Sequence, residues 1–278
     1  MVPMDFLRQT KFLSFAYFIV HLVSLTIAQP PDFLFHSCQN DVGNYTTNSN
    51  FHRNLRSLLS SLDLNTQIDQ GFYNKSFGQT GPEQVNAIAL CRGDVDVNEC
   101  RSCIGITAGK ILQVCPNQKE AMVVYITCML RYSNRSIFGV MEDRPLSYLY
   151  NRYNVTDVDQ FNQALLTLVR RLRSTAASGN SLRKFATGIE LIAGFGTLYG
   201  LVQCTPDLPK QQCDYCLAGA FREIAVCCGG KQGAIIITPS CNIRFEVYPF
   251  IGDTCCVWTQ MVVGSHVKHG CMARVNGW

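Results

Sequence analysis

The sequence has few of the residues from which catalytic and metal sites are usually built. It contains five histidines in 278 residues, and His21 lies in the apolar N-terminal stretch. We expect His36 in a loop and His52 on the polar face of a helix, while His266 and His269 lie near the C-terminus. The motifs HExxH and Gly-x-Ser-x-Gly and a phosphate-binding glycine loop are all missing. We therefore predict that the protein is not an enzyme and holds no cofactor or metal.

The excess of positive over negative charge is also small. The formal net charge is +4, and it becomes +3 when the two basic residues and one acidic residue of the first 28 positions are removed. So slight a balance gives no electrostatic reason to expect binding to nucleic acid or to an anionic membrane. The acidic residues Asp94, Asp96 and Glu99 gather at one predicted turn, where solvated roles at the start of a helix are expected.

Long apolar runs are missing after residue 28. Residues 12–28 are almost wholly apolar, follow Arg8 and Lys11, and end in the small residues of Thr26-Ile27-Ala28. This pattern is typical of a signal peptide, residues 1–28, cut after Ala28. A transmembrane anchor is the alternative, which the shortness of the run disfavours. No later stretch reaches about 18 uninterrupted apolar residues, so we expect a secreted, extracellular chain without a membrane span.

Four Asn-x-Ser/Thr sequons follow the predicted signal peptide and support export. Each begins with an asparagine that we predict to be a surface glycosylation site: Asn44, Asn74, Asn134 and Asn154.

Cysteine, in contrast, is abundant, with 15 residues. Ten of them form two sets of five with the same spacing, and each residue of the second set lies 113 positions after its counterpart. The first set is Cys91, Cys100, Cys103, Cys115 and Cys128, and the second is Cys204, Cys213, Cys216, Cys228 and Cys241. A fixed internal period is the signature of a duplicated structural unit. The chain is therefore predicted to contain two repeats.

Hydrophobic periodicity predicts similar elements in both repeats. Apolar residues at helical spacing occur in 51–62 and again in 161–172, and a second helix is expected to begin near Glu99. Short strands are expected at 72–78, 85–90, 184–190 and 196–203, and β-branched stretches close the repeats at 121–130 and 234–245. We predict an α+β fold of two tandem repeats, each with two helices packed on an antiparallel sheet and held by disulfides. Residues 143–151, which include Pro145, are interpreted as a short linker, so the repeats should pack together.

The Cys-x2-Cys pairs have two possible uses. In an intracellular protein they would suggest zinc or redox chemistry. Here each pair has its own nearby cysteines and the chain is predicted to enter an oxidising compartment, so structural disulfides are favoured. Spacing alone does not choose among the pairings.

The cysteine spacing, together with residues 239–250 around Cys241, resembles the plant cysteine-rich secretory repeat, also called the ginkbilobin or stress-antifungal domain. Tandem copies form plant cysteine-rich repeat secretory proteins, the ectodomains of cysteine-rich receptor-like kinases, and plasmodesmata-located proteins. The resemblance covers about residues 33–251 and implies repeats at 33–140 and 145–251. Residues 252–278 form an atypical tail, expected to be a disordered extension, with a truncated gene product as the alternative.

The resemblance also implies the disulfide pairing. The implied pairs are Cys38–Cys115, Cys91–Cys100, Cys103–Cys128, Cys204–Cys213 and Cys216–Cys241. The second repeat has no counterpart of Cys38, so Cys228 could pair with Cys227 or with one of the tail cysteines Cys255, Cys256 and Cys271. Because 15 is odd, at least one thiol is expected to be free or intermolecular.

Ginkbilobin binds mannose through an asparagine, an arginine and a glutamate at defined distances from its cysteines. In the first repeat these positions hold Gln39, Met122 and Ser133. In the second, the first position cannot be aligned and the others hold Ile235 and Glu246. Mannose binding is therefore not predicted from these residues. Arg131 and Arg244 are equally well interpreted as partners in structural ion pairs.

Three functions remain as hypotheses. The favoured one is a secreted binding module of the apoplast that recognises an unidentified extracellular protein or ligand in defence or stress signalling. The second is a sugar-binding antifungal lectin, with carbohydrate as its partner. The third is a truncated receptor-kinase ectodomain, which a genomic sequence continuing beyond Phe250 into a membrane span and a kinase would restore.

Overall fold

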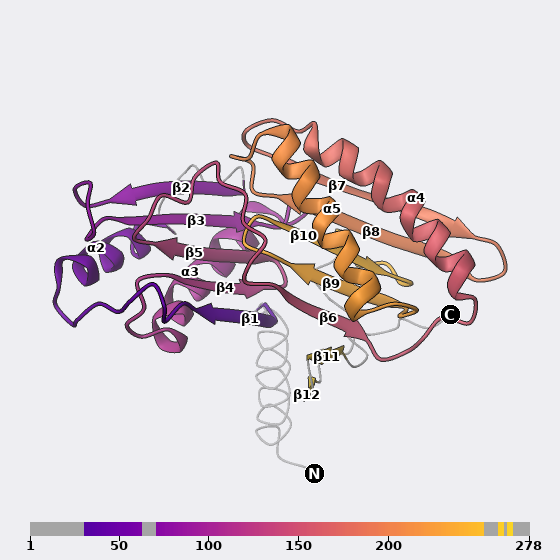
Figure 1. Cartoon of the computed structure of the whole chain (residues 1–278), viewed down its shortest axis with the longest axis horizontal. Coiled ribbons are helices and arrows are strands. Elements are labelled where there is room, and N and C mark those ends of the chain that lie inside the picture. Colours follow the sequence, from indigo (N-terminus) through magenta and orange to yellow (C-terminus); the bar gives the residue numbers. More distant parts are fainter. Residues whose placement is uncertain (1–30, 63–70, 253–260, 264–265, 269–278) are drawn as a thin grey trace, which may run out of the picture. The chain divides into compact units, whose positions relative to one another are not determined.

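The computed structural model describes residues 31–62, 71–252, 261–263 and 266–268. The predicted signal peptide and most of the predicted tail lie outside these residues. Within them the chain forms two antiparallel sheets, and two helices cover one face of each sheet (Figure 1). The predicted α+β fold of two tandem repeats, each held by its own disulfides, is confirmed.

The first repeat contains a five-stranded sheet with strand order β1-β4-β5-β3-β2. Its elements in chain order are β1 (Phe33–Cys38), α2 (Asn50–Leu59), β2 (Phe72–Phe77), β3 (Val85–Cys91), α3 (Val97–Val114), β4 (Ala121–Tyr125) and β5 (Cys128–Ser133).

The second repeat repeats this order within a seven-stranded sheet, β12-β11-β6-β9-β10-β8-β7. Its elements are β6 (Ser147–Asn151), α4 (Val158–Ala177), β7 (Lys184–Ile192), β8 (Gly196–Cys204), α5 (Lys210–Cys227), β9 (Gly233–Ile237) and β10 (Cys241–Glu246). Two short strands, β11 (Met261–Val263) and β12 (His266–Lys268), continue the sheet beyond β6.

The interpretation of residues 143–151 as a linker is wrong at its C-terminal end. Ser147–Asn151 form β6, which pairs antiparallel with β9, as Ser147 lies opposite Ile237 and Tyr150 opposite Ala234. The strand corresponds to β1 of the first repeat, which pairs with β4. Five residues beside a proline give too short a pattern for recognition, and it is the free edge of β9 that makes them a strand.

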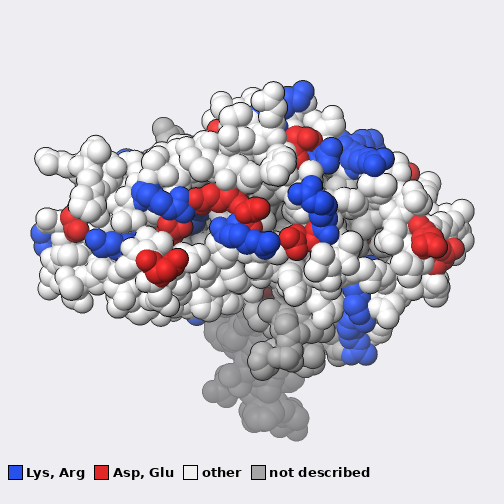
Figure 2. Space-filling model, in the orientation of Figure 1, with Lys and Arg blue, Asp and Glu red and all other residues white. Residues whose placement is uncertain are grey.

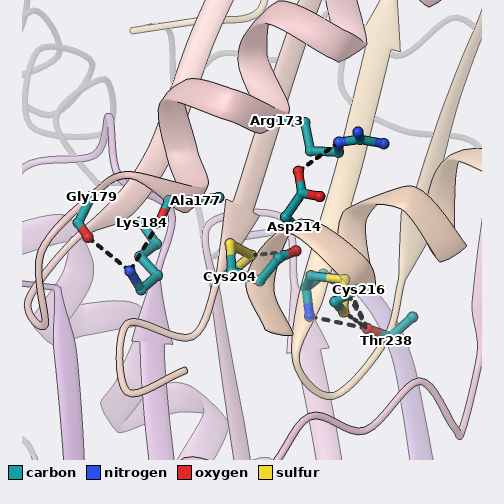
Figure 3. The surroundings of a disulfide bond; sticks show 10 residues. Arg173, Ala177, Gly179, Lys184, Cys204, Asp214, Cys216 and Thr238 are labelled. Carbon is teal, nitrogen blue, oxygen red and sulfur yellow. Dashed lines mark hydrogen bonds and ion pairs between the residues drawn. A yellow bond between two sulfur atoms is a disulfide. The ribbon is translucent and has the colours of Figure 1, made fainter. Parts of the chain in front are cut away.

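The two amphipathic helices predicted by periodicity are present as α2 and α4. Each begins with a side-chain cap: Ser49 accepts a hydrogen bond from the N–H of His52, and Asp157 accepts one from Gln160. Helix α4 is twice as long as α2, with 20 residues against 10. Beyond its end, the buried ammonium of Lys184 donates to the carbonyl oxygens of Ala177 (3.3 Å) and Gly179 (2.7 Å; Figure 3). A cation placed there satisfies carbonyls that the helix itself leaves unpaired.

Disulfides tie the other two helices to the sheets. Helix α3 is bonded to β3 by Cys91–Cys100 and to β5 by Cys103–Cys128, and Cys38–Cys115 joins β1 to its C-terminal end. Cys204–Cys213 and Cys216–Cys241 hold α5 in the same way. These are the pairs that the family resemblance implies. Of the partners left open for Cys228, the structure has the adjacent Cys227.

Apolar side chains fill the space between helices and sheet in both repeats. Among the helices described, none combines the length and the apolar composition needed to cross a lipid bilayer.

Candidate functional site

A third apolar cluster joins the two repeats. It is formed by side chains on the helix-free face of the first sheet, such as Ile88, Met122 and Val124, and by Ile235 and Ile237 of the second sheet. Because the helices cover the opposite faces, the two sheets pack through the faces that their own helices leave bare. The region between the repeats is therefore a buried interface.

A hydrogen bond and a close approach of backbone to ring lie at this interface. Gln203 Nε2 donates to the carbonyl oxygen of Cys91 (2.8 Å), across the two repeats. Gly93 faces the ring of Phe185, and a Cβ at Gly93 would lie 2.4 Å from that ring. Only glycine allows so close a contact between backbone and ring, so a larger residue at position 93 would force the ring or the backbone to move.

Two adjoining cavities lie at this interface. The smaller has a volume of about 50 Å³ and is bounded by strands β3, β4 and β5 of the first repeat and β8, β9 and β10 of the second. The larger, of about 120 Å³, lies beside the connection from β3 to α3 and is closed by residues of the second repeat that include Arg183 and Pro206. Leu90, Arg92 and Gln203 line both cavities. We take these cavities as the candidate binding site.

Arg92 is the charged residue that the two cavities share, and it is only 8% exposed. Its Nε donates to Asp94 Oδ1 (2.6 Å) and its Nη2 to Asp94 Oδ2 (3.1 Å). Asp94 Oδ2 also accepts from the backbone N–H of Gly252, at the end of the second repeat (2.9 Å). The expectation that Asp94 is solvated is therefore wrong. Asp96 does have the expected role at a helix start, because it caps α3 by accepting from Asn98 and Glu99.

The second repeat contributes Arg244 to the smaller cavity. Its guanidinium lies 4.1 Å from the ring centroid of Phe250 and donates, at 3.4 Å, to Oε1 of the fully buried Glu246. Burial raises the pKa of Glu246 to about 7, although Arg244 and Tyr248 act to lower it. Glu246 Oε2 fills the space above Gly233, where a Cβ would lie 1.7 Å away. Arg244 thus belongs to a structural ion pair that also faces a cavity.

At the positions that correspond to Gly233, Arg244 and Glu246, the first repeat has a connected network of ion pairs. Glu120 accepts from Ser133 Oγ (2.7 Å) and from Arg135 Nε (3.0 Å) and Nη2 (2.9 Å). Arg131 and Arg135 both pair with Glu142, in the segment that leads to the second repeat. Although burial acts to raise it, the hydrogen bonds from these arginines lower the pKa of Glu142. Arg131, like Arg244, is therefore a partner in an ion pair.

A family model described as salt stress response/antifungal matches the chain twice, over residues 37–135 and 150–248. The chain belongs to the salt stress response/antifungal family.

Members of this family include secretory proteins and receptor kinases. The chain is 40% identical to cysteine-rich repeat secretory protein 38 of Arabidopsis thaliana, covering 84% of this chain and 90% of that protein. It is 37% identical to an antimicrobial ginkbilobin-2-like protein of Castanea crenata, covering 87% of this chain and 98% of that protein. It is also 40% identical to cysteine-rich receptor-like protein kinase 25 of Arabidopsis thaliana. That alignment covers 84% of this chain but only 35% of the kinase.

A solved structure has the same tandem fold. The tandem DUF26 ectodomain of the Arabidopsis thaliana cysteine-rich receptor-like protein PDLP8 aligns with a TM-score of 0.67 and 24% identity, covering 78% of this chain and 99% of that one. The chain spans about a third of the length of the receptor-like kinases it matches. It is thus a cysteine-rich protein with the ectodomain fold of this family, related to receptor-kinase ectodomains.

The structure aligns the family's sugar-binding position that the sequence left open. Tyr150 lies opposite Ala234 as Cys38 lies opposite Ala121, so Tyr150 is the counterpart of Cys38 and Asn151 is the counterpart of Gln39. The second repeat therefore presents Asn151, Ile235 and Glu246 at the three positions, and two of these residue types agree with ginkbilobin. Agreement in residue type does not make these three residues a binding site, because their side chains are not accessible to a ligand.

All three of these side chains are buried, with 4%, 5% and 0% exposure for Asn151, Ile235 and Glu246. In the first repeat Met122 and Ser133 are also buried, and the cavity beside Gln39 measures only about 10 Å³. Pro145 and Pro239 help to close that cavity. A hexose needs its hydroxyls paired with accessible donors and acceptors, which neither repeat provides at these positions.

Sequence reasoning missed Arg92 and Thr127, which lie next to cysteines. Arg92 follows Cys91 at the end of β3 and Thr127 precedes Cys128 at the start of β5, so both lie where this strand pair reaches the interface. Their spacing carries no motif, and their importance comes from the packing of the second repeat. Among the described residues, no cluster of three or more histidine, cysteine, aspartate or glutamate side chains is placed to hold a metal ion.

Proposed function

We propose that the protein is an extracellular recognition module of the plant apoplast, which acts by binding a protein or small ligand in defence or stress signalling. The observation that carries the proposal is the buried junction of two ectodomain repeats around cavities lined by both. Such a junction gives one defined surface and one interior site. The relationship to receptor-kinase ectodomains supports the same function.

Recognition of carbohydrate in the manner of ginkbilobin is the second hypothesis, and the burial of its expected positions argues against it. The charge distribution supports neither nucleic acid nor an anionic membrane as partner. On the face drawn in Figure 2, basic and acidic side chains lie next to one another and do not gather into a patch of one sign.

We also propose that the protein is glycosylated, and the structure supports two of the sequons as equivalent sites. Asn44 forms an isolated bridge with Gln118, and Asn154 forms one with Lys231, the counterpart of Gln118 in the second repeat. Both asparagines are exposed. Asn74 is exposed on the edge strand β2, whereas Asn134 is half-buried.

The test is expression of the full chain with a C-terminal tag in leaf tissue. We expect the protein in apoplastic washing fluid, starting at Gln29, with glycan mass that a glycosidase removes. A variant with Asn44→Gln and Asn154→Gln should lose mass at both positions.

The purified protein is then passed over mannan-agarose, where we expect no retention. Retention that free mannose abolishes would overturn the protein-or-ligand proposal in favour of the lectin. A chain that stays inside the cells would overturn the extracellular role.

A further inference from the structure

Two polar side chains that line the smaller cavity between the repeats each have an unpaired buried atom. The backbone N–H of Arg92 donates to the carbonyl oxygen of Thr127 (2.8 Å), which places the two residues side by side. Thr127 is 2% exposed and Arg92 is 8% exposed. Thr127 Oγ1 and Arg92 Nη1 both lack a hydrogen-bond partner among the described residues, and both residues line this cavity. Buried polar atoms in native proteins are almost always paired, so two orphans in one cavity indicate a place where a ligand's polar atoms fit.

The corresponding place in the second repeat shows what normally satisfies such groups. Thr205 and Ser240 are the counterparts of Arg92 and Thr127, and the N–H of Thr205 likewise donates to the carbonyl oxygen of Ser240 (2.9 Å). There Ser240 Oγ accepts from the N–H of Glu142 (2.8 Å) and donates to the carbonyl oxygen of Val140 (3.4 Å). The connecting segment thus supplies partners in the second repeat, and no described segment does so in the first.

The rest of the lining indicates what chemistry would fit. Arg244 brings a second guanidinium to the same cavity, and its carboxylate partner is Glu246. The remaining walls are aliphatic and include Val124 and Ile235. Positive charge beside an apolar wall suits a small anion with a short hydrocarbon part.

We propose that this cavity binds a small organic carboxylate. Its oxygens accept hydrogen bonds from Arg92 Nη1 and Thr127 Oγ1, and its aliphatic part packs against Val124 and Ile235. Carboxylates are the natural acceptors for guanidinium groups because charge assists the hydrogen bond. The cavity of about 50 Å³ holds only a few heavy atoms, and the adjoining cavity of about 120 Å³ offers room for a longer ligand. This proposal deepens the recognition function and rests on it only for the extracellular source of the ligand.

The test measures butyrate binding to the purified, oxidised protein at pH 5.5 by calorimetry, with butyramide as the neutral analogue of the same shape. We expect saturable binding of butyrate and none of butyramide. Thr127→Val keeps the shape and removes the unpaired hydroxyl, so it should weaken butyrate binding about tenfold without lowering the melting temperature of the free protein. Thr205→Val removes the hydroxyl of a buried threonine in the other repeat that does not line the cavity, so it is the control and should leave the affinity unchanged.

Several results would overturn the site: no saturable butyrate binding, equal binding of butyramide, or an unchanged affinity in Thr127→Val. None of them touches the secretion and mannan results, so failure of this site is distinguishable from failure of the recognition function. Two further probes identify the source of the carboxylate. Tighter binding of a tetrapeptide with a free C-terminus than of its amidated form or of butyrate indicates a peptide terminus that extends into the larger cavity, whereas butyrate binding alone indicates a free small acid.

Discussion

The two repeats hold their first strand to the sheet by different means. In the first, Cys38 of β1 is bonded to Cys115 at the end of α3, across 77 residues. In the second, Tyr150 has the place of Cys38 on β6, and Cys228, the counterpart of Cys115, is bonded to its neighbour Cys227. In the second repeat β6 contains no cysteine, and its pairing with β9 and β11 holds it in the sheet. The first helix of the second repeat is longer and also buries Ala176 and Ala177 at its C-terminal end.

The repeats also place a buried carboxylate differently at corresponding positions. In the first, Glu120 precedes β4 and is paired with Ser133 and Arg135. In the second, the counterpart of Glu120 is Gly233 and the counterpart of Ser133 is Glu246, so the carboxylate comes from the opposite strand. One buried carboxylate occupies this place in each repeat, and either strand can supply it. Only in the first repeat does an arginine, Arg135, donate hydrogen bonds to both oxygens of that carboxylate.

The largest expected difference concerns the disulfides. Replacing Cys38 and Cys115 by alanine should lower the free energy of unfolding by about 4.5 kcal/mol, because the bridge closes a long loop. Replacing Cys227 and Cys228 by alanine should cost less than about 1 kcal/mol, since their loop contains almost no chain. Guanidinium unfolding under non-oxidising, non-reducing conditions measures both. Equal losses would show that the second repeat also depends on its bridge.

The next effect is a pH dependence that has opposite signs in the two repeats. Glu246 has a folded-state pKa of about 7, above the value of about 4.3 expected for an unfolded chain. Its contribution to stability is complete below about pH 4.3 and is lost as the pH rises through 7, which amounts to about 4 kcal/mol. Glu142 has a lowered pKa, so its contribution is present at neutral pH and is lost as the pH falls through its folded-state value.

Urea unfolding at pH 5 and pH 8 tests this contrast. Glu246→Gln mimics the protonated acid, so it should remove most of the loss seen at pH 8. Glu142→Gln should instead lower stability mainly at neutral pH. An unaltered pH profile in Glu246→Gln would mean that another group is responsible.

The smallest expected effect concerns the end of α4, which has no equivalent in the first repeat, where Gly71 is the counterpart of Lys184. Lys184→Met keeps the apolar stem and removes the donor to Ala177 and Gly179, so it should cost about 1 to 2 kcal/mol. Lys75→Met, on the exposed edge strand β2, is the control and should change stability by less than about 0.5 kcal/mol. Thermal unfolding of both variants compares them, and similar losses would show that Lys184 does not cap the helix.

Much of the fold could be predicted because its signals are local. The stripe of Phe51, Leu55 and Leu58 repeats at helical spacing, and it is buried as expected. The site could not be predicted in the same way. Arg92 and Thr127 carry no periodicity or motif, and Asp94 looks like any acidic turn residue until the end of the second repeat, at Gly252, is brought against it.

By itself the sequence determined the duplication, the helices, the strands nearest the cysteines and the family, because spacing and periodicity are properties of neighbouring residues. Only the tertiary structure decided that residues 147–151 form a strand, that Cys228 bonds to Cys227, and that Asn151 and Glu246 are buried. Those outcomes depend on which surfaces, far apart along the chain, meet when the helix-free faces of the two sheets exclude water together.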